Sequence, residues 1–425
     1  MTEVAKNAER GNTISWFEFT FPGGPELIKR VVEAAIQTAL KANALMEIFN
    51  ADYVAFKNFL NRTPVKISLG ALAVLVFAVP LKKSGVGNFL IWTFYGNVAW
   101  LSNVIRDSTV PMSSRKLTDY VHRDALELSI NNILKGVVST KYTIVYGQKG
   151  TGKSTLIDYA IHNKKGVVKL YVTASSSNKE VEQQLNEKFG FSPVKHPTLD
   201  DYVDALEKAK QPDGRLPIIV FEVERGGHAD SVLGVDAVRS LAKKFSEVSH
   251  CIIVLSEAAA VLEFGRDSSR ERYFFVGDLE DSEIKEFFER RSSTISQENI
   301  QYVVKNVGSN PVLLVNYFKE CEQESNQTEA TEKFVRKEIE MADKQLVAFS
   351  LKPILKALKE HPEGVSPKYF NNAKYEGIDL SDPIKVGHAM RLSNAIVYRI
   401  EFNKYILISR AHEVALQAYE PIIQM

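Results

Sequence analysis

The stretch YTIVYGQKGTGKSTLIDY, residues 142–159, decides the fold. Tyr142 to Tyr146 is a short β-branched and aromatic segment typical of a buried strand. Residues 147–154 fit the pattern G-x-x-x-x-G-K-[ST], and Ser154 to Ala160 predicts the start of a helix. Strand, glycine-rich loop and helix in this order are typical of a phosphate-binding loop. A chance glycine-rich turn is the alternative, but the complete pattern in its strand and helix context argues against it.

The residue types of this loop suit a bound anion. Gly147, Gly150 and Gly152 allow backbone conformations that a Cβ forbids and let amide groups approach phosphate oxygens. We expect Lys153 to contact the β- and γ-phosphates, the Ser154 hydroxyl to bind Mg²⁺, and the helix N-terminus to add partial positive charge. The predicted nucleotide-binding residues are Gly147, Gln148, Lys149, Gly150, Thr151, Gly152, Lys153, Ser154 and Thr155.

Composition bounds the class of protein. The 425 residues suffice for about two to four domains, and 45% hydrophobic with 25% charged residues is ordinary for a globular protein. A net charge of +1 gives no overall field that would attract nucleic acid or anionic lipid. Cys251 and Cys321 lack metal-ligand spacing, so we expect buried thiols in a reducing compartment, cytoplasmic or organelle-associated. The first residues lack the apolar stretch of a secretory signal.

Residues 67–105 are unusually apolar. Ile67–Leu81 and Ser84–Ile105 contain no charged residue, and Lys82 and Lys83 separate them. As helices they would reach about 22 Å and about 33 Å, against a bilayer core of about 30 Å. Only the second is long enough to span. Its asparagines and glycines oppose insertion, whereas its aromatic residues suit an interface, so membrane association and burial in a soluble domain both stay open.

Strands and helices alternate beyond residue 110, which predicts an α/β fold: a five-stranded parallel sheet with helices on both faces. The expected strands are Tyr142–Tyr146, Val167–Val172, Ile218–Phe221, Cys251–Leu255 and Tyr273–Val276. Thr198 is expected to cap a helix. The polar run Glu322–Lys333 predicts an exposed connection.

Hydrolysis of ATP to ADP and phosphate would need acidic residues beside the loop. In P-loop enzymes a carboxylate at the tip of a neighbouring strand holds the Mg²⁺ shell, and often a second one orients the attacking water. The third expected strand ends in Glu222-Val223-Glu224, so Glu222 takes the metal position with Ser154, while Val223 takes the position of the base. Glu224 is the nearby candidate base, but only if the strand end is irregular. This departure predicts secure binding and slow turnover; both acids could also be surface residues after a strand.

Polar residues near the later strands are further candidates. Ser256 ends the fourth strand, where we expect it beside the γ-phosphate. Arg266, Arg270 and Arg272 precede the fifth strand and could act as arginine fingers toward a neighbouring subunit's nucleotide. An arginine-rich segment of this kind also suits a solvated helix end.

From Tyr120 to Phe318 these features resemble the AAA+-like ATPases of the STAND and archaeal-ATPase type. The resemblance rests on the loop GQKGTGKS, the acidic and polar-ended strands, the arginines before the fifth strand, and YVVKNVGSNPVLLVNYF. It implies a helical lid whose Gly-x-Pro motif, here Gly308 to Pro311 with Asn310, places the proline near the nucleotide. It also implies that Arg123, in YVHRDALELSINNIL, lies near the adenine with Asp124.

The tail, Leu351–Met425, resembles the winged helix that often follows this core. It has a helix around Asp382–Leu392 and two apolar runs, AIVYRI and KYILIS, that predict a hairpin. In STAND switches a histidine of this module reaches bound ADP, and His412 is the matching residue. The guanine-reading motif NKxD is missing from the sequence, which favours ATP over GTP.

We expect four regions: a helical N-terminal region 1–110, to which the resemblance does not extend, and, as the resemblance implies, an ATPase core 111–290, a helical lid 291–345 and a winged-helix-like domain 346–425. Three functions stay open. The first is an ATP-driven switch or assembly ATPase, with ATP and ADP favouring different placements of the tail and possible homo-oligomers. The second is a DNA-associated ATPase, weakened by the few basic residues near the hairpin. The third is an ATPase organiser anchored to a membrane through residues 67–105.

Overall fold

The computed structural model describes residues 98–136, 140–173, 176–189, 197–224, 233–255, 269–291, 293–371 and 373–418, with 261, 262 and 264. The chain divides after Trp100 into two units, and the unit described below is Leu101–Met425. The predictions for residues 1–97, for Ser256 and for Arg266 lie outside the described residues. Among the helices that are described, none combines the length and the apolar composition that crossing a membrane requires.

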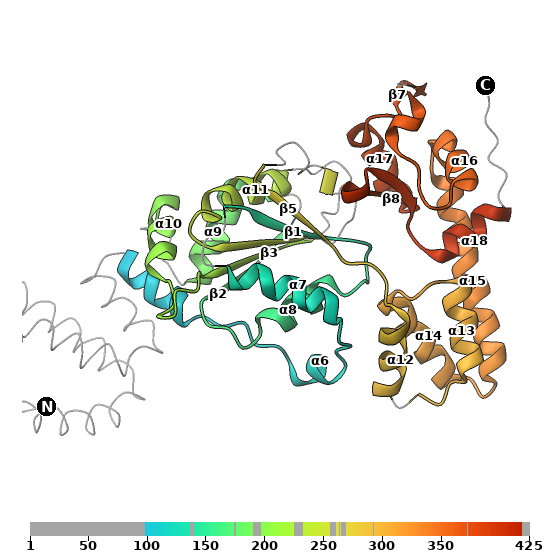
Figure 1. Ribbon diagram of the computed structural model, residues 1–425, viewed down its shortest axis with the longest axis horizontal. Coiled ribbons are helices and arrows are strands. Elements are labelled where there is room, and N and C mark those ends of the chain that lie inside the picture. Colours follow the sequence, from blue (N-terminus) through green and yellow to red (C-terminus); the bar gives the residue numbers. More distant parts are fainter. Residues whose placement is uncertain are drawn as a thin grey trace, which may run out of the picture. The chain divides into compact units, whose positions relative to one another are not determined.

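Five parallel strands form the central sheet, in the order β2-β3-β4-β1-β5 (Figure 1). They are β1 (Tyr142–Tyr146), β2 (Val167–Thr173), β3 (Ile218–Glu224), β4 (His250–Leu255) and β5 (Glu271–Phe275). Every residue of β1 and β4 is buried, as expected of parallel strands covered on both faces. The predicted α/β fold with a five-stranded parallel sheet is therefore confirmed.

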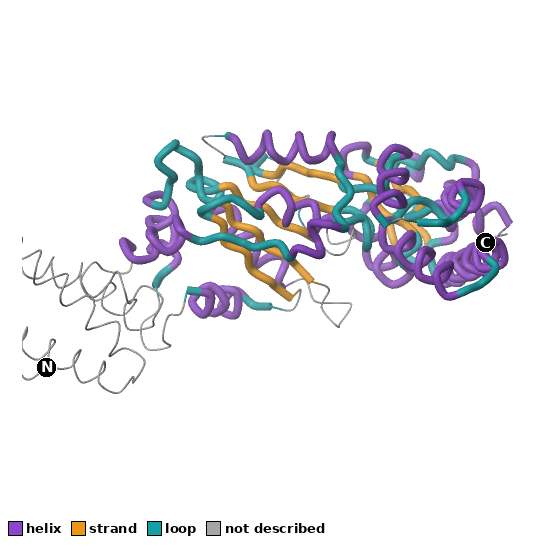
Figure 2. Tube along the Cα trace, turned by 90° about the horizontal axis from the view of Figure 1, so that it is seen from below, coloured by secondary structure: helices purple, strands orange, loops and turns teal. Residues whose placement is uncertain are grey.

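Helices cover both faces of this sheet (Figures 1 and 2). They are α7 (Asp124–Lys135), α8 (Lys153–Ile161), α9 (Asn178–Lys188), α10 (Leu199–Lys208) and α11 (Leu233–Phe245), with the short α6 (Ser114–Thr118) before them. On one face, α7 and α8 bury residues such as Ile130 and Ile157 against Val145 and Val254. The predicted cap of α10 is confirmed, because Thr198 accepts a hydrogen bond from the Asp201 amide.

Four helices follow the sheet: α12 (Asp281–Arg290), α13 (Gln297–Asn306), α14 (Pro311–Gln323) and α15 (Gln327–Ala348). The exposed connection predicted over residues 322–333 was wrong, because the chain leaves helical structure only at residues 324–326. Asn326 caps α15 by accepting from the Glu329 amide, and the Gln, Glu, Ala and Lys residues that follow favour a helix once it is capped. Phe334 of this helix is fully buried.

The C-terminal elements combine helices with a hairpin. They are α16 (Lys352–Glu360), η4 (Pro367–Phe370), β6 (Lys374–Tyr375), β7 (Ile378–Asp379), α17 (Pro383–Ser393), β8 (Ile396–Arg399), η5 (Ile400–Phe402), β9 (Lys404–Leu407) and α18 (Arg410–Ala418). The predicted helix near residue 382 and the predicted hairpin are confirmed: β8 and β9 pair antiparallel. Val365 bridges to Tyr405 and extends the hairpin by a third segment.

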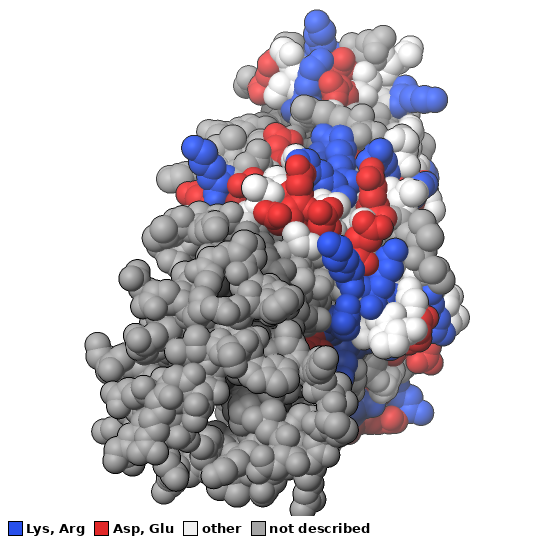
Figure 3. Space-filling view, turned by 90° about the vertical axis from the view of Figure 1, so that its left-hand side faces the viewer, with Lys and Arg blue, Asp and Glu red and all other residues white. Residues whose placement is uncertain are grey.

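Charged side chains of both signs are intermingled on the described part of the face in Figure 3. This distribution agrees with the net charge of +1.

Candidate nucleotide-binding site

The glycine-rich loop connects β1 to α8 in a conformation that needs its glycines. Gly147, Gly150 and Gly152 have φ values of 149°, 89° and 85°, which residues with a side chain rarely adopt. A Cβ at Gly147 would overlap the carbonyl oxygen of Val276, directly after β5. The loop is therefore packed against the end of β5, and its backbone follows the path that the sequence pattern predicts.

Lys153 is the first residue of α8 and is buried. Its Nζ donates to the carbonyl oxygens of Gly147, at 3.1 Å, and Gln148, at 2.6 Å, so the ammonium lies inside the curve of the loop. Burial lowers its pKa to about 8, against the opposing effect of the Glu222 carboxylate. The loop thus holds a cation at the position that phosphate binding requires.

The two predicted magnesium ligands lie together. The Ser154 hydroxyl donates a hydrogen bond to Oε1 of Glu222, which joins the start of α8 to the carboxyl end of β3. A hydroxyl and a carboxylate are oxygen donors of the kind Mg²⁺ prefers, so these residues fit the ion in chemistry. They would hold Mg²⁺ between the loop and β3, where the ion would neutralise phosphate charge.

A buried lysine that the sequence analysis missed completes this cluster. Lys169 Nζ lies 2.6 Å from Oε2 of Glu222 and 2.6 Å from Oδ1 of Asp158. Burial acts to lower the pKa of Lys169, but the hydrogen bonds and charges of Asp158 and Glu222 outweigh it and raise the pKa above the ordinary lysine value. The only signal in the sequence was one charge inside the apolar run VVKLYV.

Glu224 lies on the same face of the sheet as Glu222, because side chains alternate along the regular strand β3. Val223, between them, is buried on the opposite face, and Glu224 is exposed. The strand continues through Glu224 without the irregular end that the sequence prediction required.

Arg123 precedes α7 and holds the loop from the side. Its guanidinium donates to the carbonyl oxygens of Thr151 at 3.1 Å, Gly277 at 3.1 Å and Asp278 at 2.8 Å. Its Nε also pairs with Glu283 of α12 at 3.1 Å. The resemblance implies that Arg123 lies near the adenine, and that placement stays a prediction. In the structure it lies at the loop, and protein acceptors take up its guanidinium, so it positions Thr151.

The turn before α14 also contacts the loop. Asn310 Nδ2 donates to the carbonyl oxygen of Lys149 at 3.1 Å, while Asn310 Oδ1 caps α14. Pro311 is the first residue of that helix, between Asn310 and Val312, the two residues that approach Gly150; its place near a nucleotide stays a prediction. Asp278 is packed nearby: burial raises its pKa to about 6, although the Asn310 hydrogen bond and the charge of Arg123 act to lower it.

The remaining predicted residues lie elsewhere. His412 is buried between α18 and α15, where its Nδ1 contacts the Ser409 hydroxyl at 2.7 Å and its Nε2 contacts Gln345 Oε1 at 2.6 Å. Burial lowers the pKa of His412 to about 4. Arg270 is exposed and pairs with Glu247 at 3.1 Å. Arg272, also exposed, is paired in register with Thr143 of β1.

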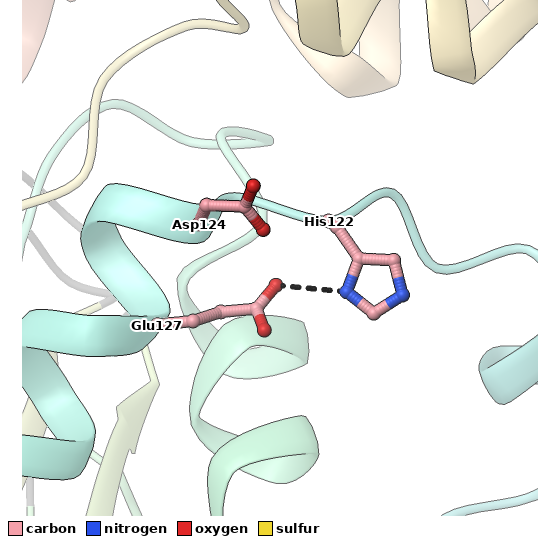
Figure 4. A group of neighbouring side chains, drawn as sticks. All are labelled: His122, Asp124 and Glu127. Atoms are coloured by element: carbon pink, nitrogen blue, oxygen red, sulfur yellow. Dashed lines mark hydrogen bonds and ion pairs between the residues drawn. The ribbon is translucent and has the colours of Figure 1, made fainter.

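His122, Asp124 and Glu127 at the start of α7 form the one group of potential metal ligands in the described residues (Figure 4). Glu127 Oε1 is already the acceptor for the Arg123 amide at 2.8 Å, the Tyr120 hydroxyl at 3.0 Å and His122 Nδ1 at 3.2 Å. Glu127 therefore already accepts hydrogen bonds from three groups at the start of α7, and hydrogen bonding within the protein accounts for the cluster.

The sheet order, the loop between β1 and α8, and the carboxylate at the end of β3 together define the fold of an AAA+-like P-loop NTPase.

Comparisons with protein-family models and with curated proteins gave no match. Solved structures do match. One is a Walker-type ATPase of Pyrococcus abyssi, with 16% identity, a TM-score of 0.45, and coverage of 73% of this chain and 99% of that chain. A second is a STAND protein with a tetratricopeptide repeat sensor from Pyrococcus horikoshii, with 15% identity, a TM-score of 0.36, and coverage of 74% and 44%. A third is Cdc6p from Pyrobaculum aerophilum, with 13% identity, a TM-score of 0.35, and coverage of 75% and 97%.

Proposed function

We propose that the chain binds ATP with Mg²⁺ at residues 147–155, hydrolyses it slowly, and acts as a nucleotide-dependent conformational switch. The observation that carries the binding proposal is the conformation of the loop. Its three glycines have positive φ angles, and the loop surrounds the buried Lys153 ammonium, an arrangement that suits a bound anion. Phosphate oxygens would replace the carbonyl oxygens of Gly147 and Gln148 as partners of that ammonium.

Slow turnover follows from the position of the acids. Glu222 is engaged by Ser154 and Lys169, so it cannot serve as a free base. Glu224 is exposed and one strand repeat, about 6.6 Å, further along β3. A base that must act from that position loses alignment, and general-base catalysis contributes about 10² to 10⁴ in rate.

The switch proposal rests on a contact between the C-terminal hairpin and the strands that flank the loop. The Tyr146 hydroxyl, one residue before Gly147, donates to the carboxylate of Glu401 at the hairpin tip. The Arg399 guanidinium lies 3.4 Å from the ring centroid of Phe275, at the end of β5. A ligand that shifts the loop would alter these contacts, and differential affinity for the docked and released hairpin is what a switch needs.

Calorimetric titration with ATP tests the binding proposal. Lys153→Ala should abolish measurable binding, because the buried cation is lost from the loop. Lys165→Ala is the control: it removes an exposed lysine just beyond α8 and should leave affinity unchanged. Equal affinity of wild type and Lys153→Ala would refute the assignment of the loop.

Phosphate release at several protein concentrations tests turnover and self-association. We expect a low basal rate that falls further in Glu224→Gln, with ATP affinity preserved. If the rate per protein rises with protein concentration in wild type and no longer rises in Arg272→Ala, this would support an arginine supplied by a second copy. Fast turnover that survives Glu224→Gln would contradict the assignment of the base.

Hydrogen exchange tests the switch. Exchange of the β8–β9 amides should differ between the ATP-bound and ADP-bound wild type, and should be the same with either nucleotide in Lys153→Ala. Identical exchange of the wild type in both states would remove the basis for coupling.

A further inference from the structure

Lys169 is a second buried lysine near the loop, besides Lys153. Its side chain is only 4% exposed, in a strand whose other inward residues are apolar. Taking an ammonium out of water is costly, and replacing a buried ion pair by apolar residues is often neutral or stabilising. Stability of the sheet therefore gives no sufficient reason for a lysine here, and its partners suggest another one.

Those partners belong to the candidate metal site. Each oxygen of the Glu222 carboxylate is engaged: Oε1 accepts from the Ser154 hydroxyl and Oε2 pairs with Lys169 Nζ at 2.6 Å. The same ammonium lies 2.6 Å from Asp158, whose other oxygen is 3.4 Å from the largely exposed Lys116. A divalent ion bound at Glu222 would lie close to a fixed positive charge, which weakens its binding.

We propose that Lys169 is a built-in cation that occupies the Glu222 carboxylate in competition with Mg²⁺, so that nucleotide binding depends only weakly on the divalent ion. This inference rests on the proposed function, because it concerns the site where nucleotide would bind. Under this proposal Glu222 serves mainly as the counter-ion of Lys169 and only secondarily as a magnesium ligand. Phosphate charge is then met chiefly by Lys153, the loop amides and the start of α8.

The test uses a variant that removes Lys169 without changing the net charge of the cluster. Lys169→Met/Asp158→Asn deletes one positive and one negative charge, which leaves Glu222 with Ser154 alone. Lys116→Met is the control, because this lysine contacts Asp158 but lies apart from the Glu222 pair. The triple variant that adds Glu222→Gln removes the carboxylate that Lys169 is proposed to occupy.

The first measurement is the Kd of a fluorescent ATP analogue, mant-ATP, with excess Mg²⁺ and with EDTA. We expect the ratio of the two Kd values to be below about threefold for wild type and Lys116→Met, and above about tenfold for the double variant. A wild-type ratio above tenfold overturns the inference without any variant. A double variant with the wild-type ratio overturns it as well.

The second measurement needs no nucleotide, and so separates this inference from the proposed function. Millimolar Mn²⁺ should raise the unfolding temperature of the double variant, because an ion that binds only the folded state stabilises it, and should leave wild type and the triple variant unchanged. Equal shifts in wild type and double variant, or no shift in the double variant, overturn the inference. If wild type binds no mant-ATP in either buffer, the proposed function fails, and the Mn²⁺ result alone judges the role of Lys169.

Discussion

Arg123 joins four protein groups around the loop, so its removal should have a large and specific cost. The guanidinium is buried and donates to the carbonyl oxygens of Thr151, Gly277 and Asp278, besides pairing with Glu283. In Arg123→Met these oxygens lose a charged donor at once. Removing one partner of a buried ion pair costs about 3–5 kcal/mol. Glu283 keeps a second donor, the Glu280 amide at 3.0 Å, so we expect the low end, about 3 kcal/mol of unfolding free energy.

Urea unfolding measures this cost. Arg290→Met is the matched control, because Arg290 also pairs with a glutamate, at 2.6 Å, but on the surface of α12, where such pairs contribute about 0.3–0.5 kcal/mol. Arg123→Lys should fall between the two variants, since a point-like ammonium cannot reach all the acceptors of a planar guanidinium. A double-mutant cycle with Glu283→Gln should give a coupling of about 1–2 kcal/mol.

The loop supplies an independent readout of the same variant. Without Arg123, Thr151 loses its anchor to the segment after β5, so mant-ATP affinity should fall with stability in Arg123→Met and stay unchanged in Arg290→Met. A stability loss below about 1 kcal/mol, within the range of ordinary substitutions, would show that the four contacts do not act as we describe.

Other substitutions probe the lid, the tail and the exposed arginines. Gly150→Ala should lower ATP affinity by about tenfold or more, because a Cβ there would lie 2.7 Å from the Asn310 side chain. Gly214→Ala is the control: Gly214 also has a positive φ, but a Cβ there would meet nothing within 4 Å, so affinity should stay unchanged. Equal losses of affinity in both variants would refute the role of the Asn310 contact. The pKa of His412 is depressed to about 4 from 6.5, so its stabilising effect is complete above pH 6.5 and is lost as the pH falls toward 4. Unfolding measured at pH 7 and pH 4.5 should show a loss of up to about 3 kcal/mol that is smaller in His412→Gln, and an equal loss in both proteins would contradict this. Arg270→Ala should change the unfolding free energy by less than about 1 kcal/mol, because its ion pair is exposed; a larger change in urea unfolding would mean that this arginine is structural.

The strands and the loop could be predicted because their signals are local. Each strand is a short apolar run, and the glycine pattern of the loop reflects backbone angles that its own residues must adopt. Ser154 and Glu222 could be paired in advance because the carboxyl ends of parallel strands meet at one edge of the sheet. The polar run at residues 322–333 misled because exposed helices and exposed connections have similar composition, and only the cap at Asn326 separates them.

The contacts of Lys169, Arg123 and His412 could not be predicted from the sequence, because they form only in the assembled tertiary structure. Lys169 meets Asp158 from the helix before its strand and Glu222 from the next strand, so its charge has meaning only once β2, β3 and α8 are assembled. The acceptors of Arg123 are mostly main-chain oxygens, which leave no mark on residue type. His412 was matched to the ADP-contacting histidine of STAND switches from the residues beside it in the sequence. Its two hydrogen-bond partners, Ser409 and Gln345, depend on how α18 packs on α15.

The close approach of Gly147 to Val276 ties the phosphate-binding loop to the border of the sheet. Strand β5 is the last in the sheet order, so among the described strands its one neighbour is β1. The Val276 amide donates to the Tyr146 carbonyl oxygen at 2.8 Å, and the Val276 carbonyl fills the space that any side chain at position 147 would need. Because these contacts leave no space between Val276 and Gly147, β5 cannot be displaced without displacing the loop as well. A molecule that bound to β5 and shifted it would therefore shift the phosphate-binding loop, since only one peptide group separates the two.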